Sequence, residues 1–212
     1  DWGAETRIGR QTRNSGGVLG RFDGALAGYR LSESLRINGV IGSPVARRRD
    51  EPFMDEKLFY GVSADIGPML GGFETSVFFI EQHAGDVLDR RAVGAELRYI
   101  DPFKSAFATV DYDIHYQTLN AAILSGSWTL ADKSTIHAGL DYRRSPYVTT
   151  WTALQGQAYP TLFEMLKQRT LGEIEVLALD RTATYKSATV GFARPINDWL
   201  QASVDATVTN LD

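Results

Sequence analysis

The clearest pattern in the chain is a strict alternation of apolar and polar side chains between Lys104 and Gln117. Alternation with a period of two predicts a β-strand, because successive side chains of a strand point to opposite faces. One face of this strand is apolar, and the opposite face carries Asp111, Asp113 and His115. One face is therefore expected to meet water and the other an oily environment.

The same alternation recurs along the chain and predicts about eleven strands, each of roughly nine to eleven residues. They lie at or near Thr6–Gln11, Ala25–Leu31, Leu35–Ile41, Leu58–Ile66, Phe73–Phe79, Val93–Tyr99, Lys104–Gln117, Asn120–Leu130, Ile136–Arg143, Thr184–Arg194 and Leu200–Thr209. Every second connection is a tight turn rich in turn-forming residues. Most of the others are longer and more polar, at Arg13–Phe22, Ser43–Glu56, Glu81–Asp89 and Arg144–Arg181. We expect a long antiparallel meander whose loops are long mainly on one edge.

Aromatic side chains gather near both ends of the expected strands. Tyr60, Phe79, Tyr112, Tyr116, Tyr142 and Tyr185 lie near the long-loop ends, and Phe73, Tyr99, Trp128 and Phe192 lie near the short-turn ends. The hydroxyl of Tyr and the indole N–H of Trp can remain in water while the ring lies in an apolar layer. Two aromatic belts therefore bound a band of small and aliphatic residues.

Composition narrows the class of protein. With 43% hydrophobic and 23% charged residues, the chain of 212 residues is neither disordered nor a bundle of membrane helices. No segment approaches the roughly 18 consecutive apolar residues of a spanning helix, so a membrane would have to be crossed by strands. The net charge of −4, with both signs interspersed, gives no electrostatic pattern for nucleic acid. The absence of cysteine excludes a disulfide scaffold and a thiolate zinc site.

Strands of uniform length, two aromatic belts and loops that are long on one edge together resemble the outer-membrane β-barrels of Gram-negative bacteria. The resemblance covers residues 1–212 and implies an all-β, antiparallel up-and-down transmembrane β-barrel in the bacterial outer membrane. The lipid bilayer would then be one partner, and the polar face would line the lumen. A soluble barrel or sandwich, with its apolar face inside, is the alternative fold.

Two features lead us to expect part of a larger barrel. The strand number is odd, and the chain ends "TVTNLD" without a terminal aromatic residue. The stretch "LALDRTATYKSATVGFARPINDWLQASVDATVTN" also resembles the barrel part of outer-membrane proteins that carry tetratricopeptide repeats, although these residues contain no such repeat.

The polar faces of the strands supply the candidate pore-lining residues. Both signs of charge occur on neighbouring strands, so these groups could form a hydrogen-bonded wall or a charge ladder that selects solutes. They are Arg36, Asp65, Glu74, Glu96, Arg98, Asp111, Asp113, His115, His137, Asp141, Arg143, Lys186 and Asp205.

The longest loop, residues 148–183, is expected to contain two short helices and to lie outside the cell or in the lumen. Thr161 to Glu164 and Thr170 to Glu173 both fit the capping box, in which Thr caps the helix and Glu bonds back to the cap. The loop could form a gate or constriction through Phe163, Glu164, Lys167 and Glu173, or it could simply pack.

We expect a conduit for a hydrophilic solute or an exported polymer, such as a small polar solute or a polysaccharide. A barrel that anchors or docks an attached periplasmic or surface partner is the second hypothesis. A hydrolase using Asp113 and His115 is the third, but it would need a cross-strand partner, because neighbours two apart on a strand are separated by roughly 6.5 Å. No catalytic motif, cofactor site or metal site is predicted, and His83 and His137 lack metal-ligand spacing.

Overall fold

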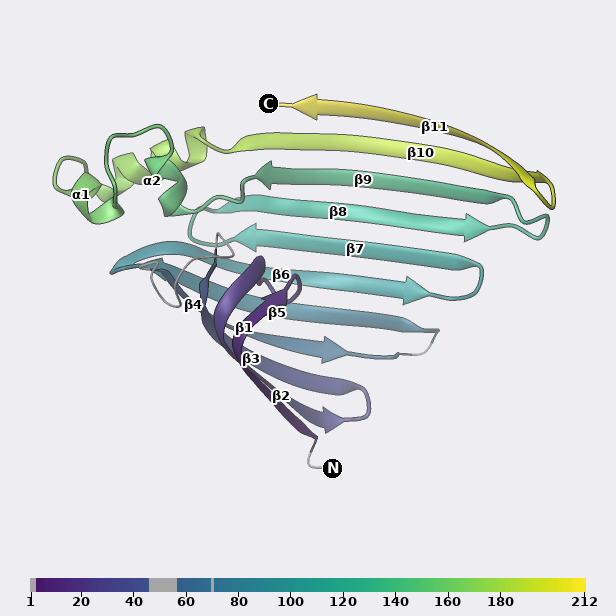
Figure 1. Cartoon of the computed structure of the whole chain (residues 1–212), viewed down its shortest axis with the longest axis horizontal. Helices are drawn as coiled ribbons and strands as arrows, with labels where there is room; N and C mark the ends of the chain where they lie inside the picture. Colours follow the sequence, from purple (N-terminus) through teal and green to yellow (C-terminus); the bar gives the residue numbers. More distant parts are fainter. Residues whose placement is uncertain (1–2, 46–56, 70) are drawn as a thin grey trace.

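The computed structural model contains one antiparallel sheet of eleven strands, which follow one another in chain order (Figure 1). The structure describes residues 3–45, 57–69 and 71–212. The strands are β1 (Ala4–Arg13), β2 (Gly20–Ser32), β3 (Leu35–Pro44), β4 (Lys57–Ile66), β5 (Phe73–Ala84), β6 (Val87–Ile100), β7 (Lys104–Asp113), β8 (Thr118–Thr129), β9 (Thr135–Ser145), β10 (Ala183–Asn197) and β11 (Leu200–Leu211). The expected all-β class, strand number and meander are confirmed.

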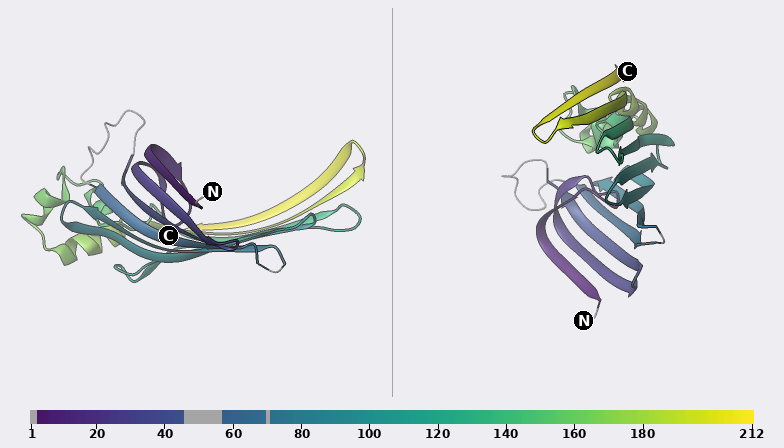
Figure 2. Two further views of the ribbon diagram at one scale, coloured as in Figure 1. Left: turned by 90° about the horizontal axis from the view of Figure 1, so that it is seen from below. Right: turned by 90° about the vertical axis from the view of Figure 1, so that its right-hand side faces the viewer.

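The sheet is curved, and the β1–β2 hairpin rises over one of its faces (Figure 2). We call this the concave face and the opposite one the convex face. Three glycines are aligned across the first strands, since Gly9 pairs with Gly24 and Gly24 with Gly42. A Cβ atom on Gly24 would lie 2.1 Å from the carbonyl oxygen of Ile41, so the close approach of these strands requires glycine there. In the described ranges, β1 and β11 form the two edges of the sheet.

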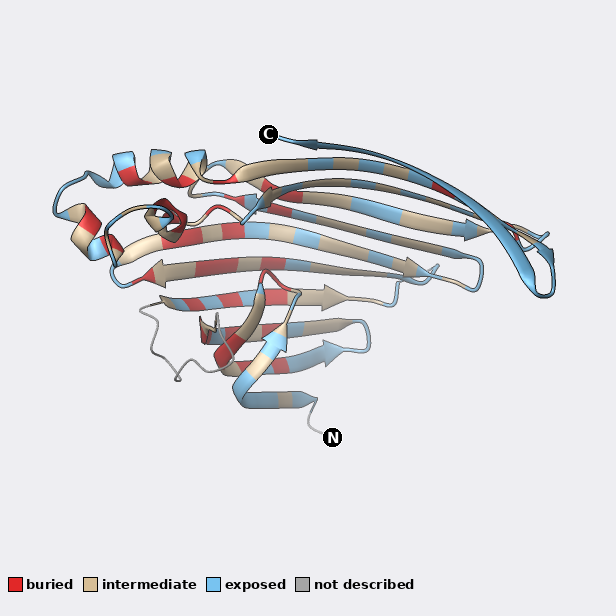
Figure 3. Cartoon of the chain, turned by 45° about the horizontal axis from the view of Figure 1, so that its top comes forward, coloured by how far each residue is buried: buried red, intermediate tan, exposed pale blue. Residues whose placement is uncertain are grey.

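The convex face carries the apolar half of each alternation, and its large side chains are exposed. Its exposed members include Val62, Val77, Val110, Leu124, Leu140, Val190, Val204 and Val208. The concave face carries most of the charged residues and also most of the buried residues of the strands, which Figure 3 shows concentrated toward the long-loop ends. The side that a soluble sheet would normally cover is therefore the uncovered side here.

The expected difference between the two edges holds only in part. Strands β5 and β6 are joined by the two-residue turn Gly85-Asp86, so no long loop exists at Glu81–Asp89. Strand β7 ends at Asp113, four residues before the expected end at Gln117. The side chain of Asp113 accepts the backbone N–H groups of His115 and Tyr116, both at 2.9 Å, and this bonding turns the chain. The loop expected at Ser43–Glu56 lies largely outside the described residues.

The long insert contains the 3₁₀-helix η1 (Thr150–Leu154) and the helices α1 (Leu162–Leu166) and α2 (Leu171–Asp180). Thr161 and Thr170 cap α1 and α2 as the sequence indicates, and Thr170 completes its capping box with Glu173. The helices bury Met165 and Ile174 together with Ala84 of the β5–β6 hairpin. In Figure 1 the helices lie at the long-loop end of the sheet, beyond the ends of β9 and β10. No helix in the described part of the chain is long and apolar enough to cross a membrane.

Candidate functional site on the concave face

Residues 14–19, which connect β1 to β2, fold over the concave face, and we call them the inward loop. The backbone N–H of Gly16 donates to the carboxylate of Glu96 on β6 at 3.0 Å. The guanidinium of Arg90, also on β6, donates to the carbonyl oxygen of Gly17 at 3.0 Å. These two bonds hold the loop against β6, in the middle of the sheet. Their partners on β6 lie more than 70 residues farther along the chain than the loop.

An apolar contact reinforces these hydrogen bonds. Val18, which is 4% exposed, packs into a cluster of apolar side chains on the otherwise polar concave face. The other members of the cluster are Phe22, Leu26, Val40, Phe59, Phe78, Ile80 and Ala92. Gly17 has a φ of +77°, and a Cβ atom there would lie 2.7 Å from the ring of Phe78. Glycine therefore allows both the left-handed turn and the close approach of the loop to the sheet.

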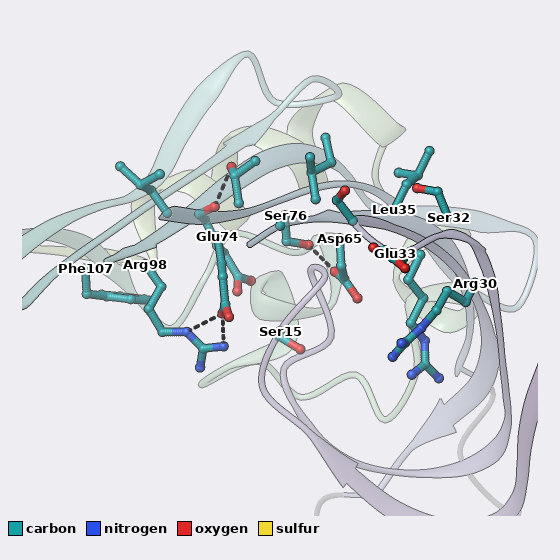
Figure 4. A pocket seen from close by; sticks show the side chains of 17 residues that line it. Ser15, Arg30, Ser32, Glu33, Leu35, Asp65, Glu74, Ser76, Arg98 and Phe107 are labelled. Atoms are coloured by element: carbon teal, nitrogen blue, oxygen red, sulfur yellow. Dashed lines mark hydrogen bonds and ion pairs between the residues drawn. The ribbon is translucent and has the colours of Figure 1, made fainter. Parts of the chain in front are cut away.

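A pocket of about 380 Å³ opens beside the inward loop (Figure 4). Ser15 of the loop lines one side, and strands from β2 to β7 line the rest. Five of the residues that the sequence assigns to the polar wall line this pocket, namely Arg36, Asp65, Glu74, Glu96 and Arg98. The aromatic ring of Phe107 borders it next to Arg98.

Several charges of the pocket neutralise one another. The carboxylate of Glu74 accepts hydrogen bonds from the guanidinium of Arg98, and Arg36 Nη2 lies 2.7 Å from the carboxylate of Glu5. All four of these side chains are partly exposed, so each pair contributes little to stability. The pairs instead keep the wall hydrophilic with almost no net charge.

Two carboxylates of the pocket are not neutralised in this way. Asp65 accepts hydrogen bonds from the neutral groups of Asn38, at 2.7 Å, and Ser76, at 2.8 Å. Glu96 accepts the N–H of Gly16. Among the described residues, neither carboxylate has a cationic nitrogen within 4.0 Å. Arg13 is the nearby cation at the base of the loop, and it bonds the hydroxyl of Ser63 at 3.2 Å.

Asp111, one of the predicted pore-lining residues, is buried and bonded to other side chains, so its charge is not exposed on the polar wall. Its carboxylate is buried, pairs with the buried guanidinium of Arg90 and accepts from Asn120 at 3.2 Å. The pair joins β6 to β7 and also orients Arg90 toward Gly17. Asp111 therefore stabilises the inward loop indirectly, by holding Arg90 in position to bond Gly17.

The structure does not bring Asp113 and His115 together as an acid–base pair. Asp113 uses one carboxylate oxygen to bond the backbone of the turn, and His115 Nε2 lies 3.0 Å from the carboxylate of Glu175 on α2. The neighbouring hydroxyl of Tyr116 bonds Thr150 Oγ1 at 2.7 Å, and burial raises the pKa of this tyrosine well above its ordinary value. These contacts attach the insert to the end of the sheet.

The remaining predicted wall residues lie on the last strands. His137 Nε2 lies 2.9 Å from Asp205 Oδ1, and the two side chains meet over Gly191, whose missing side chain leaves the space. Asp141 pairs with Arg143 at 2.7 Å on the concave face of β9. All four side chains are partly exposed.

The prediction for Lys186 was wrong about its face. Lys186 is paired in register with Tyr142, and both lie on the convex face, at the long-loop end of β10. Its ammonium group contacts the carboxylate of Asp212 at 2.7 Å. The polar–apolar alternation is weak at the start of β10, since Tyr185 and Lys186 are both amphipathic, and this is why the sequence did not fix the facing.

The four residues proposed as a gate lie on the insert. Phe163 is 66% exposed, and Lys167 lies over its ring at 4.8 Å while bonding Glu164 at 2.6 Å. Glu173 completes the cap of α2, and hydrogen bonds from Thr170 hold the pKa of Glu173 below its ordinary value. All the contacts that the structure shows for these four residues are made within the insert.

The sequence missed the inward loop as the element that covers the concave face. The available signal was the run Gly16-Gly17-Val18-Leu19, in which apolar residues follow a flexible pair inside a polar connection. Phe78 and Ile80 on the polar face of β5 were the matching signal. Neither feature shows that the loop contacts β5, because the two segments are about 60 residues apart in the chain.

Comparison with family models, with curated proteins and with solved structures found no match for this chain. Among the described residues, no group of three or more His, Cys, Asp or Glu side chains is arranged to hold a metal ion. The functional argument therefore rests on the two faces of the sheet and on the pocket.

Proposed function

We propose that this chain forms part of the wall of a transmembrane β-barrel in the outer membrane of a Gram-negative bacterium, and that hydrophilic solutes pass along its concave face. The observation that carries the proposal is the convex face, where large aliphatic side chains are exposed on strand after strand. Soluble monomers rarely expose contiguous apolar surface on this scale. Lipid is the solvent in which such a face is stable, provided that every backbone group is paired.

The aromatic residues at the short-turn end support the membrane orientation. Phe73 and Tyr99 pack against each other, with ring centroids 4.6 Å apart, and Lys104 Nζ lies 5.1 Å from the centroid of the Trp128 ring. Aromatic rings next to a cationic side chain are typical of the boundary between hydrocarbon and water. They would mark one membrane surface.

A second candidate is a barrel that anchors a periplasmic or surface partner and conducts little. The inward loop favours it, because the loop fills part of the space over the concave face with the apolar side chain of Val18. A path blocked by further contacts of this kind would carry no solute.

Thiol labelling tests the proposed facing, since the chain has no cysteine of its own. Single cysteines replace Ala108 and Val110 on the convex face of β7, and Phe107 and Thr109 on the concave face, in the complete protein in membranes. We expect the convex pair to react only with a lipid-soluble reagent and the concave pair with a water-soluble one. Labelling from water at all four positions, without membrane association, would reject the proposal.

Planar bilayers separate the two candidates. A conduit gives stepwise ion conductance when the purified complete protein inserts, whereas an anchor with a sealed interior gives none. Insertion is checked in the same preparation by protection from added protease, so that a silent bilayer can be attributed to a closed protein.

A further inference from the structure

The inward loop and the carboxylate that it contacts occupy the centre of the concave face. Gly16 lies against Glu96, Gly17 against Arg90, and Val18 in the apolar cluster of the sheet. The loop is therefore attached at three consecutive residues. A solute that moves along this part of the concave face passes beside Ser15, through the pocket that the loop borders.

The charge balance at this point is uneven. Glu74 is paired with Arg98, and Arg36 with Glu5, so these four side chains contribute almost no net charge. Asp65 and Glu96 lack an ion pair in the described residues, and Arg13 lies at the base of the loop, outside the pocket lining. The charged residues that line the pocket are three arginines and four carboxylates, a balance of one negative charge: Arg30, Arg36 and Arg98, and Glu33, Asp65, Glu74 and Glu96.

We propose that the inward loop is the constriction of the conduit and that Glu96 is its selectivity-determining residue, which favours small cationic solutes over anions. This inference rests on the proposed function. Glu96 suits the role because the loop fixes its position through the N–H of Gly16 while the side chain still lines the pocket. A fixed carboxylate at the narrowest point attracts cations and repels anions over a Debye length of about 8 Å in physiological salt.

The helical insert is not assigned this role. Its predicted gate residues make their contacts within the insert, and Figure 1 places the helices beyond the strand ends. The constriction is therefore assigned to the inward loop and not to the insert.

Substitution of Glu96 tests the selectivity in planar bilayers containing the complete protein. In Glu96→Gln, the amide oxygen still accepts the N–H of Gly16, so the loop keeps its position while the charge is lost. We expect the potassium-to-chloride permeability ratio to fall about sevenfold, because one unit charge at roughly 7 Å in water gives a Boltzmann factor of about 2.7 that favours the cation and an equal factor that disfavours the anion. The matched control is Asp198→Asn, which removes a carboxylate from the β10–β11 turn and should leave the ratio unchanged.

The position of the loop is tested by a reversible cross-link. A Cβ atom on Gly16 would lie 3.3 Å from Cβ of Ser63, close to the separation of about 3.8 Å found in disulfides. The oxidised double variant Gly16→Cys/Ser63→Cys should keep the wild-type conductance and permeability ratio, since the inward position is the conducting one. Replacing residues 14–19 by Asn-Gly should raise the conductance about twofold or more and remove the preference for cations. Gly16→Cys alone controls for the strain of a side chain at a φ of +61°.

Three results would overturn the inference while leaving the conduit intact. They are an unchanged permeability ratio in Glu96→Gln, an unchanged conductance in the shortened variant, and a cross-linked protein that is silent until a reductant is added, because the loop would then be a lid that must leave. A wild-type protein that inserts and never conducts would instead reject the proposed function itself.

Discussion

The concave face of β2–β7 and that of β8–β11 arise from the same alternation and have different environments. The first, which we call the covered half, lies under the inward loop, and its Phe78 and Ile80 are buried. The second, the open half, is covered at its long-loop end, where the backbone N–H of Val148 donates to Asn120 of β8, but farther along the strands the side chains of His137 and Asp205 are 42% and 53% exposed. The alternation determines which way a side chain points, whereas a connection distant in sequence determines whether that side chain meets water.

The difference has consequences for how each half is stabilised. The covered half has an apolar cluster and a buried ion pair, both of which require exact partners. The open half relies on backbone pairing between strands and on partly exposed ion pairs, which contribute little. Equivalent substitutions in the two halves should therefore have unequal effects.

The largest contrast is expected between a phenylalanine inside the apolar cluster of the covered half and one that lies outside this cluster, beside the pocket. Phe22, at 1% exposure, lies in the apolar cluster with its ring 5.2 Å from that of Phe59, and Phe22→Ala should cost about 3 to 5 kcal/mol of unfolding free energy. Phe107, at 39% exposure beside the pocket, should cost about 1 kcal/mol when replaced by alanine. Urea unfolding in lipid vesicles measures both, and equal losses would show that the loop does not cover a packed cluster.

Ion pairs provide the next contrast. Asp111→Asn removes the charge that neutralises the buried guanidinium of Arg90 and should cost about 3 to 5 kcal/mol. Asp141→Asn leaves Arg143 in contact with water and should cost less than about 1 kcal/mol. The same unfolding experiment gives both values. A small loss of unfolding free energy in Asp111→Asn would mean that the guanidinium of Arg90 is in contact with water in the native state.

Glycines on the concave face extend the comparison to backbone spacing. A Cβ atom on Gly94 would lie 2.3 Å from both the Phe78 ring and the carbonyl oxygen of Val110, so Gly94→Ala should cost about 1 to 3 kcal/mol. A Cβ atom on Gly191 would meet the partly exposed ends of His137 and Asp205, which can rotate away, and this change should cost less than about 1 kcal/mol. The prediction fails if the second substitution is the more damaging.

How much of this could be predicted depended on the range of the interaction. The alternating positions gave eleven strands and the facing of most side chains, including the five charged residues that share the pocket. The caps at Thr161 and Thr170 were predicted because a capping box is a contact between residues three apart. Contacts between residues that are close in the chain can therefore be predicted from the sequence.

The two main errors, the end of β7 and the inward loop, have different physical causes. The alternation through Ile114 and Tyr116 predicted strand, but the side chain of Asp113 bonds the following backbone and ends β7 earlier. The inward loop was missed because its partners are long-range contacts, and nothing in a single sequence states which apolar residues of a polar face meet which loop.

The smallest effect should appear in the insert, outside both halves. Hydrogen bonds from Thr170 hold the pKa of Glu173 below its ordinary value, so the ionised cap contributes stability above the unfolded pKa, and this contribution is lost as the pH falls through the folded pKa. We expect amide exchange in the first turn of α2 to accelerate in acid while the strands of the covered half remain protected. Glu173→Gln should remove most of this pH dependence. If amide exchange in the strands accelerated at the same pH as in α2, this prediction would be wrong.

The inward loop also has a consequence for biosynthesis. Its partners Arg90 and Glu96 follow their contacts on the loop by 73 and 80 residues, and Ser63 follows Arg13 at the base of the loop by 50. The loop therefore leaves the ribosome before β6 and can make these contacts only after β6 has been made. Until then Val18 and Phe22 remain exposed in an unfinished chain, so this hairpin is where aggregation or binding by a chaperone would begin.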